Sequence, residues 1–140
     1  MSHRRDAIRD LDRLLANLSP RLDADTFVFT SHRGARYGDL ASLQPVATVQ
    51  ETEGLTLVLR AADATAAGIA SEPEFRRITL CVHSDLEAVG LTAAVSGALA
   101  EANIPANLLA GAYHDHLFVP VAQAEAAMAV LNALADRAGR

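Results

Sequence analysis

One continuous run, residues 77–121, constrains the fold of this chain more than any other feature. It opens with a nearly continuous apolar strand at 78–83, continues through a polar loop at 83–90 and enters a helix rich in small residues at 89–102. Two further strands close the run, at 106–113 and 116–121. A strand without polar alternation is typical of one that is covered on both faces. The order also leaves unpaired main-chain N–H groups where the strand meets the helix, a position that binds small anions without catalytic side chains.

The rest of the chain extends this α+β pattern. Residues 6–18 place apolar side chains on one face of an amphipathic helix, at Ile8, Leu11, Leu15 and Leu18. Strands are predicted at 26–30, 45–50 and 55–60, helices at 61–68 and 123–135, and a linker at 70–76. The connection 51–54, which ends in Gly54, predicts a hairpin between the second and third of these strands.

These elements predict two units. The N-terminal unit, 1–70, holds the first helix and a degenerate series of strands whose central helix is reduced to the irregular loop 31–44. The C-terminal unit, 71–140, is the well-formed one. Because each half is near the lower size limit for independent folding, the two sheets are expected to pack together or merge.

The composition excludes several classes of function. A formal charge of −5 and the absence of lysine argue against nucleic-acid binding and exclude Schiff-base chemistry. No apolar run is long enough to cross a membrane, and the N-terminus lacks the apolar core of a signal peptide. The single cysteine, Cys81, indicates a reducing, cytoplasmic location, and its place in an apolar strand predicts a buried thiol. The common nucleotide-binding, hydrolase and metalloprotease motifs are absent from the sequence.

The loop 83–90 has two interpretations. Ser84 and Glu87 have the spacing of a capping box, and Asp85 could cap a helix equally well, so the loop could simply start the helix. Alternatively, the loop and the first helical turn direct main-chain N–H groups at a ligand carboxylate or phosphate. Gly90 lies inside the predicted helix, where glycine costs about 1 kcal/mol, and this favours the second interpretation.

The triplet His114-Asp115-His116 resembles a metal or proton-transfer site. In a strand, positions 114 and 116 share a face, so two imidazoles could bind one ion. A third ligand would have to come from His83, His32 or a carboxylate, and no Cys–His spacing supports one. We therefore predict a role at the rim of a ligand site or a subunit contact, and no bound metal.

Three other polar residues remain candidates. Glu51 and Glu53 could share a strand face and act as acid and base, but no activated nucleophile lies near them in the sequence, so solvated positions beside a turn are favoured. Asn107 opens a strand directly after Pro105. Its amide could satisfy local main-chain groups or contact the amino group of a ligand, and both interpretations remain open.

Residues 83–120 resemble an ACT domain, and in particular the regulatory ACT domains of aspartate kinases. The strand, the loop, the glycine, the helix, its EANI exit and the hairpin follow in the same order and spacing. More narrowly, EGLTLVL, ITLCVHSDLEAVGLTAA and AGAYHDHLFVP look like a bacterial family of small stand-alone tandem-ACT proteins of uncharacterised function, at 53–59, 78–94 and 110–120.

This resemblance implies a ferredoxin-like βαββαβ fold in each half, with two ACT-like units side by side and an amino acid bound at an interface between such units. The positions that would hold the ligand are Ser84, Asp85, Leu86, Glu87, Ala88, Val89, Gly90, Leu91, Asn107, Ala110, Gly111 and Ala112. The residues expected at the rim are Glu53, Tyr113, His114, Asp115 and His116. Asn107 falls where aspartate-kinase domains place an acidic residue, which argues against a cationic amino acid.

The function expected from these observations is that of a non-enzymatic regulatory protein that binds a small molecule, an amino acid, through main-chain groups. No cofactor and no metal are expected, and the partners are the ligand, a second copy in a homodimer and a regulated protein, with neither nucleic acid nor membrane involved. One alternative is a purely structural module for dimerisation or partner interaction. A less favoured alternative is a metal-dependent enzyme that uses His114, Asp115 and His116.

Overall fold

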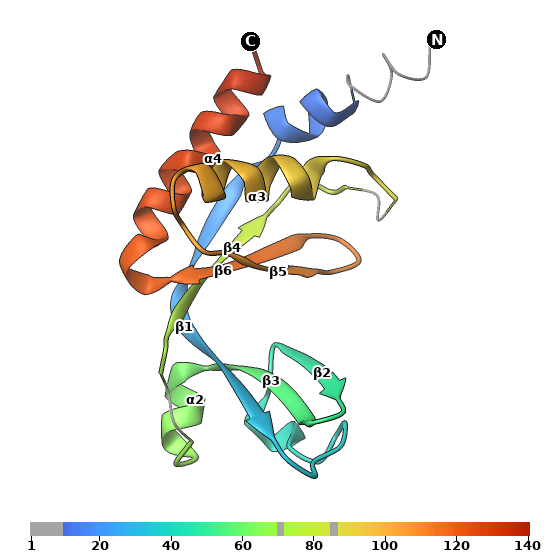
Figure 1. The fold of residues 1–140 in the computed structure, drawn as a ribbon, viewed down its shortest axis with the longest axis vertical. Helices are drawn as coiled ribbons and strands as arrows, with labels where there is room; N and C mark the ends of the chain where they lie inside the picture. The colour runs from blue at the N-terminus through green and yellow to red at the C-terminus, as the bar shows by residue number, and fades with distance from the viewer. Residues whose placement is uncertain (1–9, 70–71, 85–86) are drawn as a thin grey trace. The chain divides into compact units, whose positions relative to one another are not determined.

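The computed structural model describes residues 10–69, 72–84 and 87–140, which form two compact units. The larger unit combines the chain up to Asp23 with Arg77–Arg140, and the smaller unit is Ala24–Arg76. Figure 1 shows the elements of both. The N-terminal residues that the structure describes therefore belong with the C-terminal half of the chain.

Over the described ranges, six strands form one sheet that is combined with helices, so the α+β class is confirmed. Their bounds are β1 Pro20–His32, β2 Ala47–Glu51, β3 Gly54–Arg60, β4 Phe75–Leu80, β5 Asn107–Ala110 and β6 Asp115–Pro120. Hydrogen-bonded neighbours follow the order β2-β3-β1-β4-β6-β5. The long strand β1 begins in the larger unit and ends in the smaller one.

The smaller unit is built on an antiparallel β2-β3-β1 sheet. β2 and β3 form the predicted hairpin, in which Glu51 pairs with Gly54 across a two-residue turn. β3 also pairs with β1, from Phe27 opposite Arg60 to His32 opposite Leu55. The short helix α2, Ala61–Ala66, and a loop with a single 3₁₀ turn, η1 Ala41–Leu43, complete the unit. Its buried core consists of Val28, Leu55, Leu57, Leu59, Ala61 and Ala64.

The larger unit carries two long helices, α3 Leu91–Glu101 and α4 Ala124–Ala138, the second entered through the 3₁₀ turn η2 Val121–Gln123. The two helices contact each other, and α4 also contacts β6 (Figure 1). Their apolar stripes meet the strand residues Ile78, Leu80, Leu117 and Val119 in one core. The N-terminal helix, helical over residues 10–16, adds Leu15 to the same core. Within the described parts of the chain, no helix has the length and apolarity needed to span a bilayer.

Two predictions about β4 and Cys81 were wrong. The strand covers Phe75–Leu80 instead of 78–83, so the expected linker already contributes two strand residues. Cys81 follows the strand and is exposed, with its Sγ 3.8 Å from the carbonyl oxygen of Thr79. The apolar sequence continues past Leu80, where the N–H groups of Cys81 and Val82 donate to the carbonyls of Ser19 and Leu18, just before β1.

Candidate functional site

The N-terminus of α3 is set by Gly90. The helix begins at Leu91, and Gly90 is its N-cap with φ +99°, in the left-handed region that favours glycine. The prediction that the helix begins near residue 89 and contains Gly90 was therefore wrong. The glycine serves instead to turn the chain into the helix.

The predicted capping box does not cap α3. The N-cap residue Gly90 makes no side-chain cap hydrogen bond, and Ser84 lies well before it. The first turn of α3 carries no acidic residue either. The residues of this turn therefore supply no carboxylate of their own to its main-chain N–H groups. Asp85 and Leu86, two of the predicted ligand-binding positions, lie outside the described residues.

A cavity of about 520 Å³ lies between the N-terminal helix and the end of the loop 83–90, which leads from β4 to α3. Glu87, Ala88 and Val89 line it from the loop, and Val89 is 85% exposed. The N-terminal helix lines it with Asp10, Leu11, Arg13 and Leu14. Leu11 also packs on Gly90, because a Cβ at that glycine would lie 3.1 Å from Leu11 Cδ2.

The N-terminal helix was not predicted to contribute to the site. Its apolar spacing predicted the helix and placed Leu11 on the buried face, but nothing in the sequence indicated that it lies against the loop. Nothing in the sequence marked Asp10 and Arg13 as site residues, because charged residues on an amphipathic helix are ordinarily solvated.

The turn between β5 and β6 lies beside the start of the loop. The His83 and Tyr113 rings are 5.4 Å apart between centroids, which brings a predicted rim residue to the loop. β5 ends at Ala110, so the prediction of a strand through residue 113 was wrong. The chain turns because the Gly111 N–H donates to the His114 carbonyl at 2.9 Å, a contact that a side chain at Gly111 would crowd.

The other predicted positions are more scattered. Asn107 is exposed at the start of β5, opposite Phe118 and three residues before Ala110. No hydrogen bond joins its amide to the loop among the residues that the structure describes. Glu53 lies in the β2–β3 turn of the smaller unit and is exposed. Within the larger unit, the end of the loop lies beside the N-terminal helix, and the β5–β6 turn meets the start of the loop through Tyr113 and His83.

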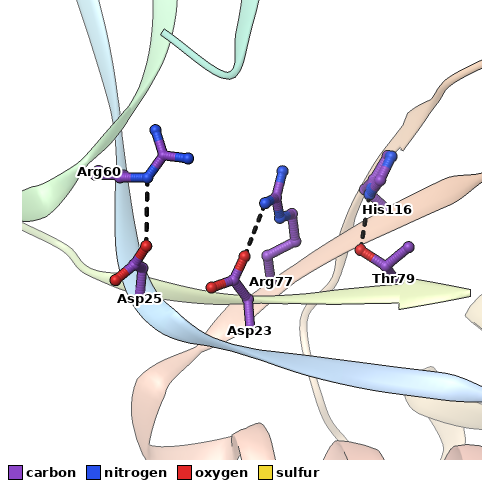
Figure 2. Close-up of polar contacts among 6 residues, drawn as sticks. All are labelled: Asp23, Asp25, Arg60, Arg77, Thr79 and His116. Atoms are coloured by element: carbon purple, nitrogen blue, oxygen red, sulfur yellow. Dashed lines mark hydrogen bonds and ion pairs between the residues drawn. The ribbon is translucent and has the colours of Figure 1, made fainter. Parts of the chain in front are cut away.

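The histidine triplet is divided between a turn and a strand. His114 precedes β6, whereas His116 lies within it and its Nδ1 is 2.9 Å from Thr79 Oγ1 (Figure 2). On the same strand as Thr79, Arg77 Nη2 donates to Asp23 Oδ2 at 2.7 Å. Across the described parts of the chain, no three potential metal ligands are grouped. The polar contacts of His116 are thus those of a hydrogen-bonded sheet residue.

Burial lowers the pKa of His116 below its ordinary value of 6.5. The positive charges of Arg77 and His114 add to this lowering, with a smaller contribution from Arg21. The carboxylate of Asp115 acts in the opposite direction. The neutral imidazole is therefore the form that the folded protein favours.

We predict a pH-dependent loss of stability that arises from His116. Because the folded pKa is the lower one, the unfolded chain binds more protons below about pH 6.5, and stability falls as the pH decreases through that value towards the folded pKa. Urea unfolding of the native protein and of His116→Gln, between about pH 5 and 8, measures this. The native protein should lose more stability than the variant on acidification; parallel curves would exclude His116 as the cause.

The fold and the site define a chain of two ferredoxin-like units with an uncapped helix N-terminus in the larger unit. Family models described as ACT domain match residues 6–76 and residues 72–133, and the first alone covers more than half of the chain. The protein belongs to the ACT domain family, with two such domains in tandem. No curated protein matches the sequence at a significant level.

Several solved structures share this fold. A protein of unknown function from Vibrio cholerae, described as a possible transport protein, is 50% identical with a TM-score of 0.79, over 87% of this chain and 93% of that one. The regulatory subunit of aspartate kinase from Thermus flavus is 13% identical with a TM-score of 0.61, over 82% and 95% of the two chains. Its counterpart from Thermus thermophilus is 12% identical, also with a TM-score of 0.61, over 84% and 97%. The predicted likeness to ACT domains of aspartate kinases is thus confirmed for the fold.

Proposed function

We propose that this protein is a non-enzymatic regulatory protein that binds an amino acid at the N-terminus of α3. Membership of the ACT family supports a regulatory, ligand-binding role in general. The observation that carries the specific site is the uncapped first turn of α3, which Gly90 opens beside a cavity of about 520 Å³.

The chemistry of the site suits a carboxylate. Main-chain N–H groups at a helix N-terminus, together with the helix dipole, attract an anion. The cavity beside them has an apolar wall of Leu11, Leu14 and Val89 and a polar rim that includes Asp10 and Arg13. In our proposal, the main chain holds the ligand carboxylate, the rim contacts its amino group, and the apolar wall receives its side chain.

The predicted ligand positions are kept in this proposal. Ser84, Glu87, Ala88, Val89, Gly90 and Leu91 form the described part of the loop and the first helical turn. Ala110, Gly111 and Ala112, with Tyr113, lie at the neighbouring β5–β6 turn, and Asn107 lies farther along β5. We further propose a cytoplasmic homodimer that acts on a separate protein, since ACT domains often associate in pairs.

A thermal-shift screen against the twenty standard amino acids tests the proposal. A ligand that binds only the folded protein stabilises it by about 2.7 kcal/mol at a concentration one hundred times its Kd. At least one amino acid should therefore raise the midpoint of unfolding. No shift with any amino acid or related carboxylate would leave a structural module as the better account.

Gly90→Ala should weaken amino-acid binding by about tenfold or more. The new methyl group would meet Leu11 at 3.1 Å, and a φ of +99° costs an L residue about 1–2 kcal/mol, so the turn that presents the N–H groups would shift. Isothermal titration with the amino acid that gives the largest thermal shift measures the change in Kd.

Gly97→Ala is the matched control on the same helix. Gly97 is exposed in the middle of α3, and its added methyl group would meet nothing within 4 Å. This variant should gain about 0.5–1 kcal/mol of stability and keep the native Kd. Equal affinities of the two variants would place the binding site elsewhere.

A further inference from the structure

A second cavity lies entirely within the smaller unit, under the loop that joins β1 to β2. It has a volume of about 430 Å³. Its floor is formed by the buried side chains of Leu55 and Leu57 on β3, and Thr48 of β2 lines it as well. Its other walls come from the loop and the start of β2, through Tyr37, Gly38, Leu40, Ala41, Gln44, Pro45, Val46 and Ala47.

The register of the hairpin explains the arrangement of this floor. Thr48 pairs with Leu57 and Gln50 pairs with Leu55, and directly opposed residues of an antiparallel pair have their side chains on the same face. The hydroxyl of Thr48 therefore stands beside the leucines, on the face that the loop covers.

The loop over the cavity is held in place by Gln50. Its Oε1 accepts a hydrogen bond from the Tyr37 N–H at 3.1 Å, and its Nε2 donates to the Ala35 carbonyl at 3.2 Å. Asp39 Oδ2 accepts from the Arg36 N–H at 2.8 Å. These contacts fix the part of the loop that carries Tyr37, so the cavity exists before any ligand binds. A preformed cavity does not require its ligand to order the loop.

Gln44 is the polar residue that the loop presents to the cavity at some conformational cost. It has φ +52° and ψ +55°, the left-handed conformation that residues other than glycine rarely adopt. Such residues occur often at ligand sites. Within the described parts of the chain, neither the Gln44 amide nor the Thr48 hydroxyl forms a side-chain hydrogen bond, so both are available to a ligand.

We propose that this cavity binds a small, uncharged molecule with an apolar ring and a hydrogen-bonding amide or hydroxyl group. Its volume lies in the range of small-molecule sites. None of its lining residues is charged, so an ionised group buried there would lose its hydration without gaining an ion pair. The partly exposed Leu40, Pro45 and Val46 receive the ring, and Gln44 and Thr48 receive its polar group. Tyr37, 80% exposed, flanks the ring at the mouth.

This ligand class differs from the one proposed for the larger unit. A free amino acid carries two charges, and this cavity offers no charged partner for either of them. The inference therefore does not depend on the proposed function, and either can fail without the other.

Three isosteric probes test the ligand class: benzamide, benzoate and benzamidine share one shape and carry no charge, a negative charge and a positive charge. Amide chemical shifts of the full-length protein report where each one binds. For a probe of this size we expect a benzamide Kd on the order of 1 mM. Benzamide should shift the amides of residues 37–48, and the two charged probes should bind at least about tenfold more weakly. Absence of shifts with benzamide, or equal affinity for all three probes, would overturn the proposal.

Two variants test the assignment of residues. Gln44→Gly removes the amide while relieving the left-handed conformation, so it should remain folded and bind benzamide several-fold more weakly. Tyr37→Ala should also weaken binding, whereas the exposed Val49, which does not line the cavity, supplies the control variant Val49→Ala. If both Gln44→Gly and Tyr37→Ala bind benzamide like the native protein, the ligand lies elsewhere and the proposal fails.

Discussion

Gly54→Ala should destabilise the protein by about 3 kcal/mol, a cost typical of severe overpacking. Gly54 is the first residue of β3, and a Cβ there would lie 2.6 Å from the carbonyl oxygen and 2.9 Å from the carbonyl carbon of His32. Both contacts are with main chain, which cannot move aside as the end of a flexible side chain can. The β1–β3 ladder also holds His32 in place, opposite Leu55. Urea unfolding followed by circular dichroism measures the loss.

Gly38→Ala separates the steric effect from the conformational one. Gly38 has φ +93°, in the same smaller unit, but a Cβ there would meet nothing within 4 Å. This variant should lose only about 1 kcal/mol, from the left-handed conformation alone. If Gly54→Ala were no more destabilising than Gly38→Ala, the close approach of β3 to His32 would not be what requires the glycine.

The β2–β3 hairpin shows how far local sequence reasoning reaches. The connection 51–54 with its terminal glycine predicted the turn, and the observed pairing of Glu51 with Gly54 confirms it. The reason for the glycine was not accessible from the same residues. It depends on His32, which is brought to Gly54 by pairing of two strands that are distant in the sequence.

The start of α3 shows a different limit. The apolar spacing predicts one stripe of Leu91, Val95, Leu99 and Ala102; the first three side chains are buried, whereas Ala102 is the C-cap and is exposed. The exact beginning of the helix was not predicted correctly, since Gly90 was expected to lie inside the helix and is instead its N-cap. Helix ends depend on the local main-chain conformation, which the apolar period does not report.

The two cavities were beyond the reach of spacing arguments. The loop 31–44 was predicted as irregular, and the structure agrees, but the cavity under it requires Gln50 of β2 to hold Tyr37 in place. The cavity beside α3 similarly requires the N-terminal helix to lie against residues about 75 positions later in the chain. Contacts between side chains that form only through tertiary packing produce no periodic pattern in the sequence.

Leu131→Ala should cost about 4 kcal/mol, near the upper part of the range for a fully buried leucine. Leu131 lies on α4 with no exposed surface, in the core that α3, β4 and β6 share. Leu134→Ala is the matched control, since it makes the same change one turn later on the same helix, where the side chain is only partly buried. It should lose about half as much, because less apolar surface is removed and water can fill the space. Thermal and urea unfolding of both variants give the comparison, and an equal or larger loss for Leu134→Ala would contradict the core described for the larger unit.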